Sequence, residues 1–181
     1  MIQIRLKKRK INRLINYNYS KGGYYFVTIC TKNKEEFFGN IKDKKMILNE
    51  IGLNAKKYWE EIPKHFSEIK LDKYIIMPDH VHGILIIKNF FVIDNKFVNK
   101  YSGVLHLLKT KELLKKRQYQ KLPIVIGSYK SAVTKNVNKL DRIINFQWQR
   151  SFYDNIIFDE KTLNSIRKYI TENPLRWSKK N

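Results

Sequence analysis

Two long runs of strand-forming residues joined by a tight turn constrain the fold of this chain more than any other feature. They span Ile69 to Met77 and His80 to Ile87, and Pro78-Asp79 separates them. Both runs are rich in β-branched and aromatic residues, which favour strands, while Pro and Asp favour turns. The pattern predicts a hairpin of two long antiparallel strands, and therefore a sheet against which the rest of the chain packs.

The other segments predict the remaining layers of an α+β domain. The spacing of apolar residues predicts helices over Lys44–Ile62, Ile126–Asn138 and Lys161–Glu172, and further strands over Tyr24–Thr31 and Phe146–Gln149. Pro63 and Pro174 are expected to end the first and the last of these helices. The order of elements predicts a ferredoxin-like (split βαβ) antiparallel sheet with helices packed on one face.

The length of 181 residues fits one domain, which we predict at residues 21–177. Residues 1–20 are predicted to form a basic N-terminal arm, and residues 178–181 a short tail. Residues 89–122 lack a steady apolar period and are rich in Lys and Arg, which predicts a variable basic insert within the domain.

The charge of the chain indicates its partner. Lys and Arg number 37 against 16 Asp and Glu, a formal net charge of +21. Such a charge favours a polyanion, with nucleic acid the first candidate and an anionic membrane surface the second. No long amphipathic stretch has a clean basic face, which argues against a membrane. The N-terminal cluster around Arg5, Lys7 and Arg9 is either a solvated arm or, as we predict, an arm that contacts phosphates.

The same sequence features predict where the protein resides. The longest apolar runs are far below the ~20 residues that span a bilayer, and no apolar stretch suited to a signal peptide follows the basic start. The single cysteine, Cys30, excludes an internal disulfide and a Cys-rich zinc site, and it is expected to be a core residue in a reducing compartment. We therefore expect a cytoplasmic, nucleoid-associated protein.

His80 and His82 flank Val81 in a predicted strand. Side chains alternate along a strand, so both histidines point to one face, with Cα atoms roughly 6–7 Å apart. Both imidazoles can then reach one metal ion. The alternative is two ordinary polar residues on a sheet face, although two unpaired imidazoles among apolar neighbours would be poorly solvated.

Tyr169 and Asn173 are four residues apart in a predicted helix and therefore share a face. The Asn173 amide offers an oxygen as a third metal ligand, and the Tyr169 phenol is a competent nucleophile toward phosphorus. The alternative is that Tyr169 packs in the core and that Asn173 caps the helix before Pro174.

Four residues in the segments 127–131 and 148–150 are candidate DNA contacts. Lys130 is expected to hold a phosphate near a helix start, or else to be an exposed lysine. Tyr129 and Trp148 either stack on unpaired bases or pack in the core. Arg150, in Trp148-Gln149-Arg150, is a further candidate for the DNA backbone.

These motifs together resemble a known family. His80-Val81-His82 after Ile-Ile-Met-Pro-Asp, Gly-Ser-Tyr-Lys-Ser at 127–131, Trp-Gln-Arg at 148–150 and Tyr-Ile-Thr-Glu-Asn-Pro-Leu-Arg-Trp at 169–177 follow the order of the single-tyrosine (HUH) transposases. The chain resembles the REP-associated tyrosine transposases, relatives of insertion-sequence enzymes that use single-stranded DNA. The resemblance covers residues 22–177 apart from the insert.

The resemblance implies a reaction and a set of residues. The reaction is metal-dependent cleavage and rejoining of single-stranded or hairpin DNA through a 5′-phosphotyrosine, with Mg²⁺ or Mn²⁺. His80 and His82 match the metal ligands, Tyr169 rather than Tyr153 matches the nucleophile, and Asn173 stands where relatives often carry Gln. The branch implies a monomer, although insertion-sequence relatives are dimers.

Other readings stay open beside this one. A domesticated protein that binds DNA hairpins without cutting them has the same charge and fold. A relaxase or replication initiator is a further alternative, but such proteins usually need more chain. This sequence also has Asn-Ile-Ile-Phe at 155–158, where relatives usually carry His-Ile-Ile-Arg, so a contact made there in relatives is in doubt.

Overall fold

The structure is a computed structural model that describes residues 22–88, 121–140 and 145–177. The predicted DNA contacts Arg5, Lys7 and Arg9, most of the insert and the tail lie outside the described residues.

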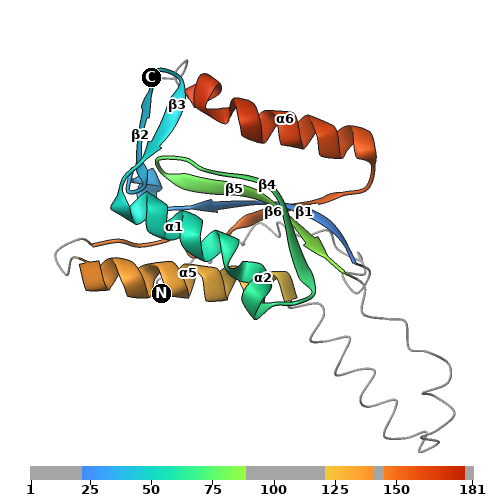
Figure 1. The fold of residues 1–181 in the computed structure, drawn as a ribbon, viewed down its shortest axis with the longest axis horizontal. Helices are drawn as coiled ribbons and strands as arrows, with labels where there is room; N and C mark the ends of the chain where they lie inside the picture. The colour runs from blue at the N-terminus through green and yellow to red at the C-terminus, as the bar shows by residue number, and fades with distance from the viewer. Residues whose placement is uncertain (1–21, 89–120, 141–144, 178–181) are drawn as a thin grey trace, which may run out of the picture.

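A four-stranded antiparallel sheet forms the centre of the fold (Figure 1). Its strands run in the order β4 (Ile69–Ile76), β5 (His80–Ile87), β1 (Gly23–Cys30) and β6 (Tyr153–Ile157). The predicted hairpin is the pair β4 and β5. Helical segments connect β1 to β4 and β5 to β6, and with them this strand order is that of a ferredoxin-like sheet. The predicted α+β class is therefore confirmed.

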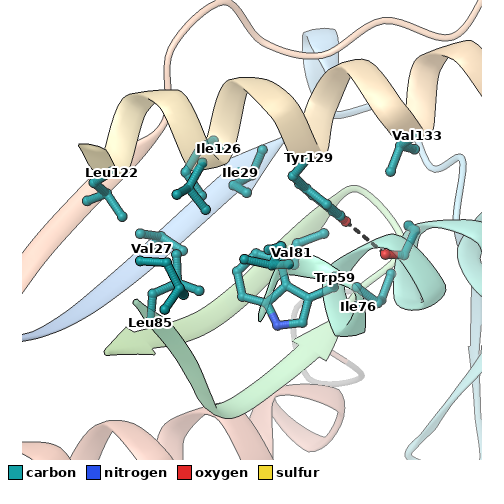
Figure 2. Close-up of a cluster of buried hydrophobic side chains, with 14 of the residues drawn as sticks. Val27, Ile29, Trp59, Ile76, Val81, Leu85, Leu122, Ile126, Tyr129 and Val133 are labelled. Atoms are coloured by element: carbon teal, nitrogen blue, oxygen red, sulfur yellow. Dashed lines mark hydrogen bonds between the residues drawn. The ribbon is translucent and has the colours of Figure 1, made fainter. Parts of the chain in front are cut away.

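The larger core lies between the sheet and three helices on one face (Figure 1). These are α1 (Glu50–Glu60), α2 (Ile62–His65) and α5 (Lys121–Leu140). The odd-numbered residues of β1 and β5 point to this face because strand side chains alternate. Figure 2 shows them against the helices, and they are Val27, Ile29, Val81 and Leu85, with Trp59, Ile126, Tyr129 and Val133 opposite.

A further helix, α6 (Glu160–Trp177), covers the other face of the sheet. Its buried residues Leu163 and Ile170 pack with Ile84 of β5 and Ile157 of β6. The even-numbered side chains of β5 therefore point toward α6, and this set includes both histidines.

A short hairpin replaces the first part of the predicted helix at 44–62. The strands β2 (Gly39–Lys42) and β3 (Lys45–Leu48) pair antiparallel, and α1 begins only at Glu50. The side chain of Asn49 caps α1 by accepting a hydrogen bond from the backbone N–H of Gly52 at 2.9 Å. Pro63 also differs from its prediction, because it lies in the first turn of α2, where a missing N–H does little harm.

Three further boundaries differ from the prediction. Residues 146–149 form only one isolated bridge, between Thr31 and Trp148, and the fourth strand is β6. Helix α5 begins at Lys121, so the last two residues of the predicted insert belong to it. Helix α6 continues through Pro174 to Trp177 instead of ending before the proline.

Lys88 and Lys121, the described residues on either side of residues 89–120, both contact Glu68. The backbone N–H of Lys88 donates to the Glu68 carbonyl at 2.9 Å. The Lys121 ammonium pairs with the Glu68 carboxylate at 2.5 Å. Since Lys88 follows the last residue of β5, this junction lies at the end of the sheet away from His80.

Gly83 follows His82 on β5 and faces the larger core, where its lack of a side chain leaves room for the ring of Trp59. A Cβ at residue 83 would lie 2.2 Å from Trp59 Cζ2, and Trp59 is 0% exposed. We expect Gly83→Ala to lower the free energy of unfolding by about 1–3 kcal/mol, because a packed indole cannot move away without strain. Urea denaturation followed by circular dichroism measures this loss.

Gly127→Ala is the matched control, because a Cβ at this exposed position of α5 meets nothing within 4 Å. Ala is expected to stabilise this helix by about 0.5–1 kcal/mol relative to Gly. A Gly83→Ala protein as stable as the wild type would contradict the packing of Trp59 described above.

Candidate active site

His80 and His82 lie at the start of β5, on the face that α6 covers. Their Cα partners on β1 are Cys30 and Thr28, and their ring centroids are 4.3 Å apart. The strand β5 is central, with β4 paired on one side and β1 on the other. The alternation of side chains along this fixed strand therefore brings the two imidazoles together.

The Nδ1 atom of each imidazole already has a partner. His82 Nδ1 lies 2.9 Å from the Thr28 hydroxyl oxygen, and His80 Nδ1 bonds the carboxylate of Asp79. Asp79 is itself only 4% exposed. A carboxylate or hydroxyl on one ring nitrogen fixes the tautomer and aims the other nitrogen, which is how metal-binding histidines are usually held.

The Nε2 atoms are the ones left for a ligand. His80 Nε2 is buried and has no hydrogen-bond partner in the described part of the structure. His82 Nε2 lies 3.4 Å from the hydroxyl of Tyr169. A buried polar atom without a partner is uncommon in native proteins, and a missing ion or substrate atom is one accepted explanation.

His82 is held in its neutral form. It is 6% exposed, and its burial, together with the nearby His80, lowers the pKa of His82 to about 3, although a hydrogen bond with the backbone of Val27 acts in the opposite direction. Neutral imidazole is the form that binds metal ions.

Helix α6 carries three residues of the site at intervals of four. The Tyr169 ring lies 5.3 Å from the ring of His82, and the Trp177 ring lies 5.8 Å from the ring of His80. Asn173 is midway between them on the same helix face, so it lies over the histidine pair. Because α6 continues past it, the 6% exposed Asn173 is not a helix cap.

The donor set fits a divalent metal ion that also has oxygen ligands. Within residues 22–88, 121–140 and 145–177, no cluster of three or more His, Cys, Asp or Glu side chains could hold a metal. The groups here that could hold a metal ion are His80, His82 and the amide oxygen of Asn173. Imidazole and amide oxygen, completed by phosphate oxygens, suit Mn²⁺ or Mg²⁺.

Tyr153, the other candidate nucleophile, is farther from the histidines. Its Cα partner is Thr28, which in turn pairs with His82 across β1. Tyr153 therefore faces the same side of the sheet but lies two strands from His82, at roughly 10 Å. Tyr169 is the tyrosine that contacts His82.

An ion pair fixes α6, and with it Tyr169, to the sheet edge. Arg167 donates from Nε to Asp72 Oδ1 at 3.0 Å and from Nη2 to Asp72 Oδ2 at 2.6 Å. Asp72 belongs to a bulge of β4, where the register shifts between Leu71 and Tyr74. The bulge reverses the side-chain alternation, which leaves Asp72 facing α6 while Tyr74 faces the larger core.

Replacement of Asp72 by Asn is expected to loosen α6 and to lower the urea midpoint at pH 7. Hydrogen bonds from Arg167 hold the pKa of Asp72 below its ordinary value of 3.8, despite an opposing effect of partial burial. A lowered carboxyl pKa stabilises the fold above pH 3.8, and this contribution is lost as the pH falls through the lowered pKa. The midpoints of the two proteins should therefore converge in acid.

Glu160→Gln is the control for this ion pair. Glu160 contacts the same Arg167 at 3.4 Å, but its side chain is 74% exposed, so its loss should leave the midpoint nearly unchanged. A constant difference between wild type and Asp72→Asn from pH 7 down to pH 2–3 would contradict the linkage.

Two of the predicted DNA contacts have structural roles instead. Tyr129 is 2% exposed and donates its hydroxyl proton to the Ala55 carbonyl at 3.2 Å (Figure 2), so its predicted stacking on bases is wrong. Lys130 lies in the middle of α5, since the helix begins at Lys121, and not near an anion-binding helix start. Its ammonium donates to the Gln149 carbonyl at 2.6 Å, and burial lowers the pKa of Lys130.

Trp148 and Arg150 lie on the stretch that Lys130 holds. The half-buried Trp148 donates from Nε1 to the Lys130 carbonyl at 3.2 Å and packs against Phe38 and Phe146. Arg150 is exposed. DNA contact by these two residues remains a prediction.

The sequence interpretation missed Asp79 and Thr28. Asp79 could have been found from the sequence, because an acidic residue next to a predicted metal-binding histidine is a candidate partner for its ring. The sequence analysis uses Asp79 only as part of the turn Pro78-Asp79. Thr28 is separated from His82 by 54 positions, and only the register of β1 against β5 brings them together.

Comparisons with known proteins agree with this fold. No protein-family model matches the chain. A Haemophilus influenzae protein described as uncharacterized is 37% identical over 172 residues, which are 93% of this chain and 89% of that protein. A solved structure of a REP-associated tyrosine transposase bound to a REP hairpin is 14% identical, with a TM-score of 0.52 over 91% of this chain and 73% of that one.

Another solved structure, of a Deinococcus radiodurans protein, is 16% identical and covers 88% of this chain and 95% of its own. Its TM-score against this chain is 0.48. Separately, none of the helices in the described ranges is long and apolar enough to cross a membrane.

Proposed function

We propose that this chain cleaves and rejoins single-stranded or hairpin DNA. It belongs to the same family as the Haemophilus influenzae protein. It also shares a fold with a REP-associated tyrosine transposase. The proposed enzyme is a metal-dependent, single-tyrosine transposase or nickase. The main support is the position of the Tyr169 hydroxyl, 3.4 Å from Nε2 of His82, whose ring lies 4.3 Å from the ring of His80 between centroids.

In the proposed reaction, the Tyr169 oxygen attacks the scissile phosphorus. A phosphorus–oxygen bond to Tyr169 forms, the bond to the 3′ oxygen breaks, the phenol proton is lost to solvent, and the 3′ oxygen gains a proton. The product is a 5′-phosphotyrosine with a free 3′-hydroxyl. Attack by a 3′-hydroxyl on this ester reverses the step, so no external energy source is required.

The residues around Tyr169 would hold it for this attack. The half-buried Tyr169 ring packs edge-on against Phe26, with ring centroids 6.1 Å apart, and the Arg176 guanidinium lies 5.4 Å from the ring centroid. Arg167 lies two residues before Tyr169 on α6, and its ion pair with Asp72 of β4 holds the helix against the sheet. A Mg²⁺ or Mn²⁺ ion held by His80, His82 and Asn173 would supply a Lewis acid for the phosphate.

DNA is the proposed partner, and one chain is the proposed acting unit. The net charge of +21 supports attraction to a polyanion. Tyr169 contacts His82 of its own chain, which supports a site that is complete within a monomer. Both properties are proposals to be tested with the activity.

The test uses purified protein, Mn²⁺ and single-stranded hairpin DNA from the sequence that flanks its own gene. A denaturing gel should show a protein–DNA adduct and a shortened strand, and EDTA or His82→Ala should remove both. Tight binding of the same DNA without cleavage, with or without metal, would instead favour a hairpin-binding protein.

A further inference from the structure

A cavity of about 510 Å³ lies where the chain leaves β1. Two stretches, residues 31–34 and 147–150, form its walls. They are joined by backbone hydrogen bonds from Lys32 N–H to the Gln147 carbonyl at 2.8 Å and from Gln149 N–H to the Cys30 carbonyl at 2.9 Å. The volume falls within the usual range for a site that holds one small molecule or one nucleotide.

The lining of this cavity is cationic. Lys32, Lys34 and Arg150 contribute to it, and none of its lining residues is acidic. In the described part of the chain, none of these three cations pairs with an Asp or Glu. Positive charge that the protein does not neutralise favours an anionic group such as a phosphate.

The same lining offers groups that can recognise a base. Asn33 and Gln149 carry amides that both donate and accept hydrogen bonds, and the half-buried indole of Trp148 is fixed by its own hydrogen bond to Lys130. Asn33 and Lys34 have φ of 54° and 59°, in the left-handed region that residues other than Gly rarely adopt. Such strained conformations recur at ligand sites.

The cavity is held at a fixed position relative to the histidines. Thr31, which lines it, donates its backbone N–H and its hydroxyl to the Asp79 carbonyl, each at 2.9 Å. Asp79 directly precedes His80, and Cys30, directly before Thr31, is the register partner of His80. The cavity and the histidine pair are thus at the same end of the sheet.

We infer that this cavity binds one nucleotide of a single DNA strand, next to the phosphate that lies at the histidines. Lys34 and Arg150 contact its phosphate, and Gln149 contacts its base. The inference rests on the proposed function for the identity of the strand, but it concerns binding and specificity, not the covalent step.

The test measures binding of a fluorescein-labelled hairpin with a single-stranded flank by anisotropy, in a Tyr169→Phe background that prevents covalent capture. The variants are Arg150→Gln and Lys34→Asn, since Asn tolerates the left-handed backbone at residue 34. Each lost phosphate contact should reduce the slope of log K against log salt by about 0.7, which is about fivefold weaker binding at 0.1 M salt. Lys56→Gln, at an exposed position of α1, is the charge-matched control.

A scan with single abasic positions tests the base contact. The parent protein should lose most affinity at one position of the flank, and Gln149→Ala should remove this dependence. Variants that match Lys56→Gln in affinity, slope and abasic profile would overturn the inference, even where wild-type protein forms the covalent adduct. Salt slopes that fall as expected, without any adduct from the wild type, would leave the cavity as a DNA site and refute the proposed chemistry.

Discussion

Replacing Tyr169 by Phe is expected to abolish the covalent protein–DNA adduct while the fold and the DNA affinity stay unchanged. The substitution removes only the hydroxyl, which is the proposed nucleophile. The ring contacts with Phe26 and His82, at centroid distances of 6.1 and 5.3 Å, do not require it. A denaturing gel with Mn²⁺ reports the adduct, and anisotropy with the same DNA reports the affinity.

Tyr153→Phe is the matched control for this experiment. Tyr153 faces the same side of the sheet and is 49% exposed, so DNA can reach it, but it lies two strands from His82. This variant should form the adduct at the wild-type level. If the adduct persists in Tyr169→Phe and disappears in Tyr153→Phe, the nucleophile is Tyr153.

Loss of either imidazole is expected to abolish Mn²⁺ binding, and loss of Asp79 to weaken it about 10–100-fold. His80 and His82 would be two of three protein ligands, so His80→Ala leaves too few. Asp79 acts through His80, because its carboxylate bonds Nδ1 and thereby fixes the orientation of the ring and of its buried Nε2. Isothermal titration of the protein with Mn²⁺ alone measures these affinities without reference to activity.

Asp43→Asn provides the control for the lost charge, because Asp43 lies in the exposed β2–β3 turn. Its φ of 49° is one that Asn also tolerates. Equal Mn²⁺ affinities for Asp79→Ala and Asp43→Asn would show that Asp79 does not position His80. A wild-type protein that binds no Mn²⁺ would refute the metal site itself.

The sequence predicts the elements whose periodicity is strong and unbroken. The β4–β5 hairpin, β1 and α6 follow from alternation or helical spacing over many residues. The β2–β3 hairpin does not, because its turn at Asp43-Lys44 lacks glycine and its apolar residues merge with the helical spacing of α1. The end of the insert was also misplaced, because the first turn of α5 continues the basic, aperiodic composition of the residues before it and so gives no signal of a helix start.

The candidate site divides in the same way. Pairs that are close in the chain, such as His80 with His82 and Tyr169 with Asn173, are predictable from the period of one strand or one helix. Thr28 is not, because it depends on strand register. Tyr129 was ambiguous because a tyrosine suits both a core and a DNA surface, and only the packing of α5 against Trp59 decides between them.

The junction at Glu68 has a consequence for how this scaffold could vary. Lys88 and Lys121, which flank residues 89–120 in the sequence, both bond Glu68, at the end of β5 away from His80. A change in the length of the segment between them alters loop-closure entropy by only about 0.6 kcal/mol per doubling. The segment is therefore a natural exchange site: a different recognition element could be grafted there while the chemistry at the opposite end of β5 is left intact.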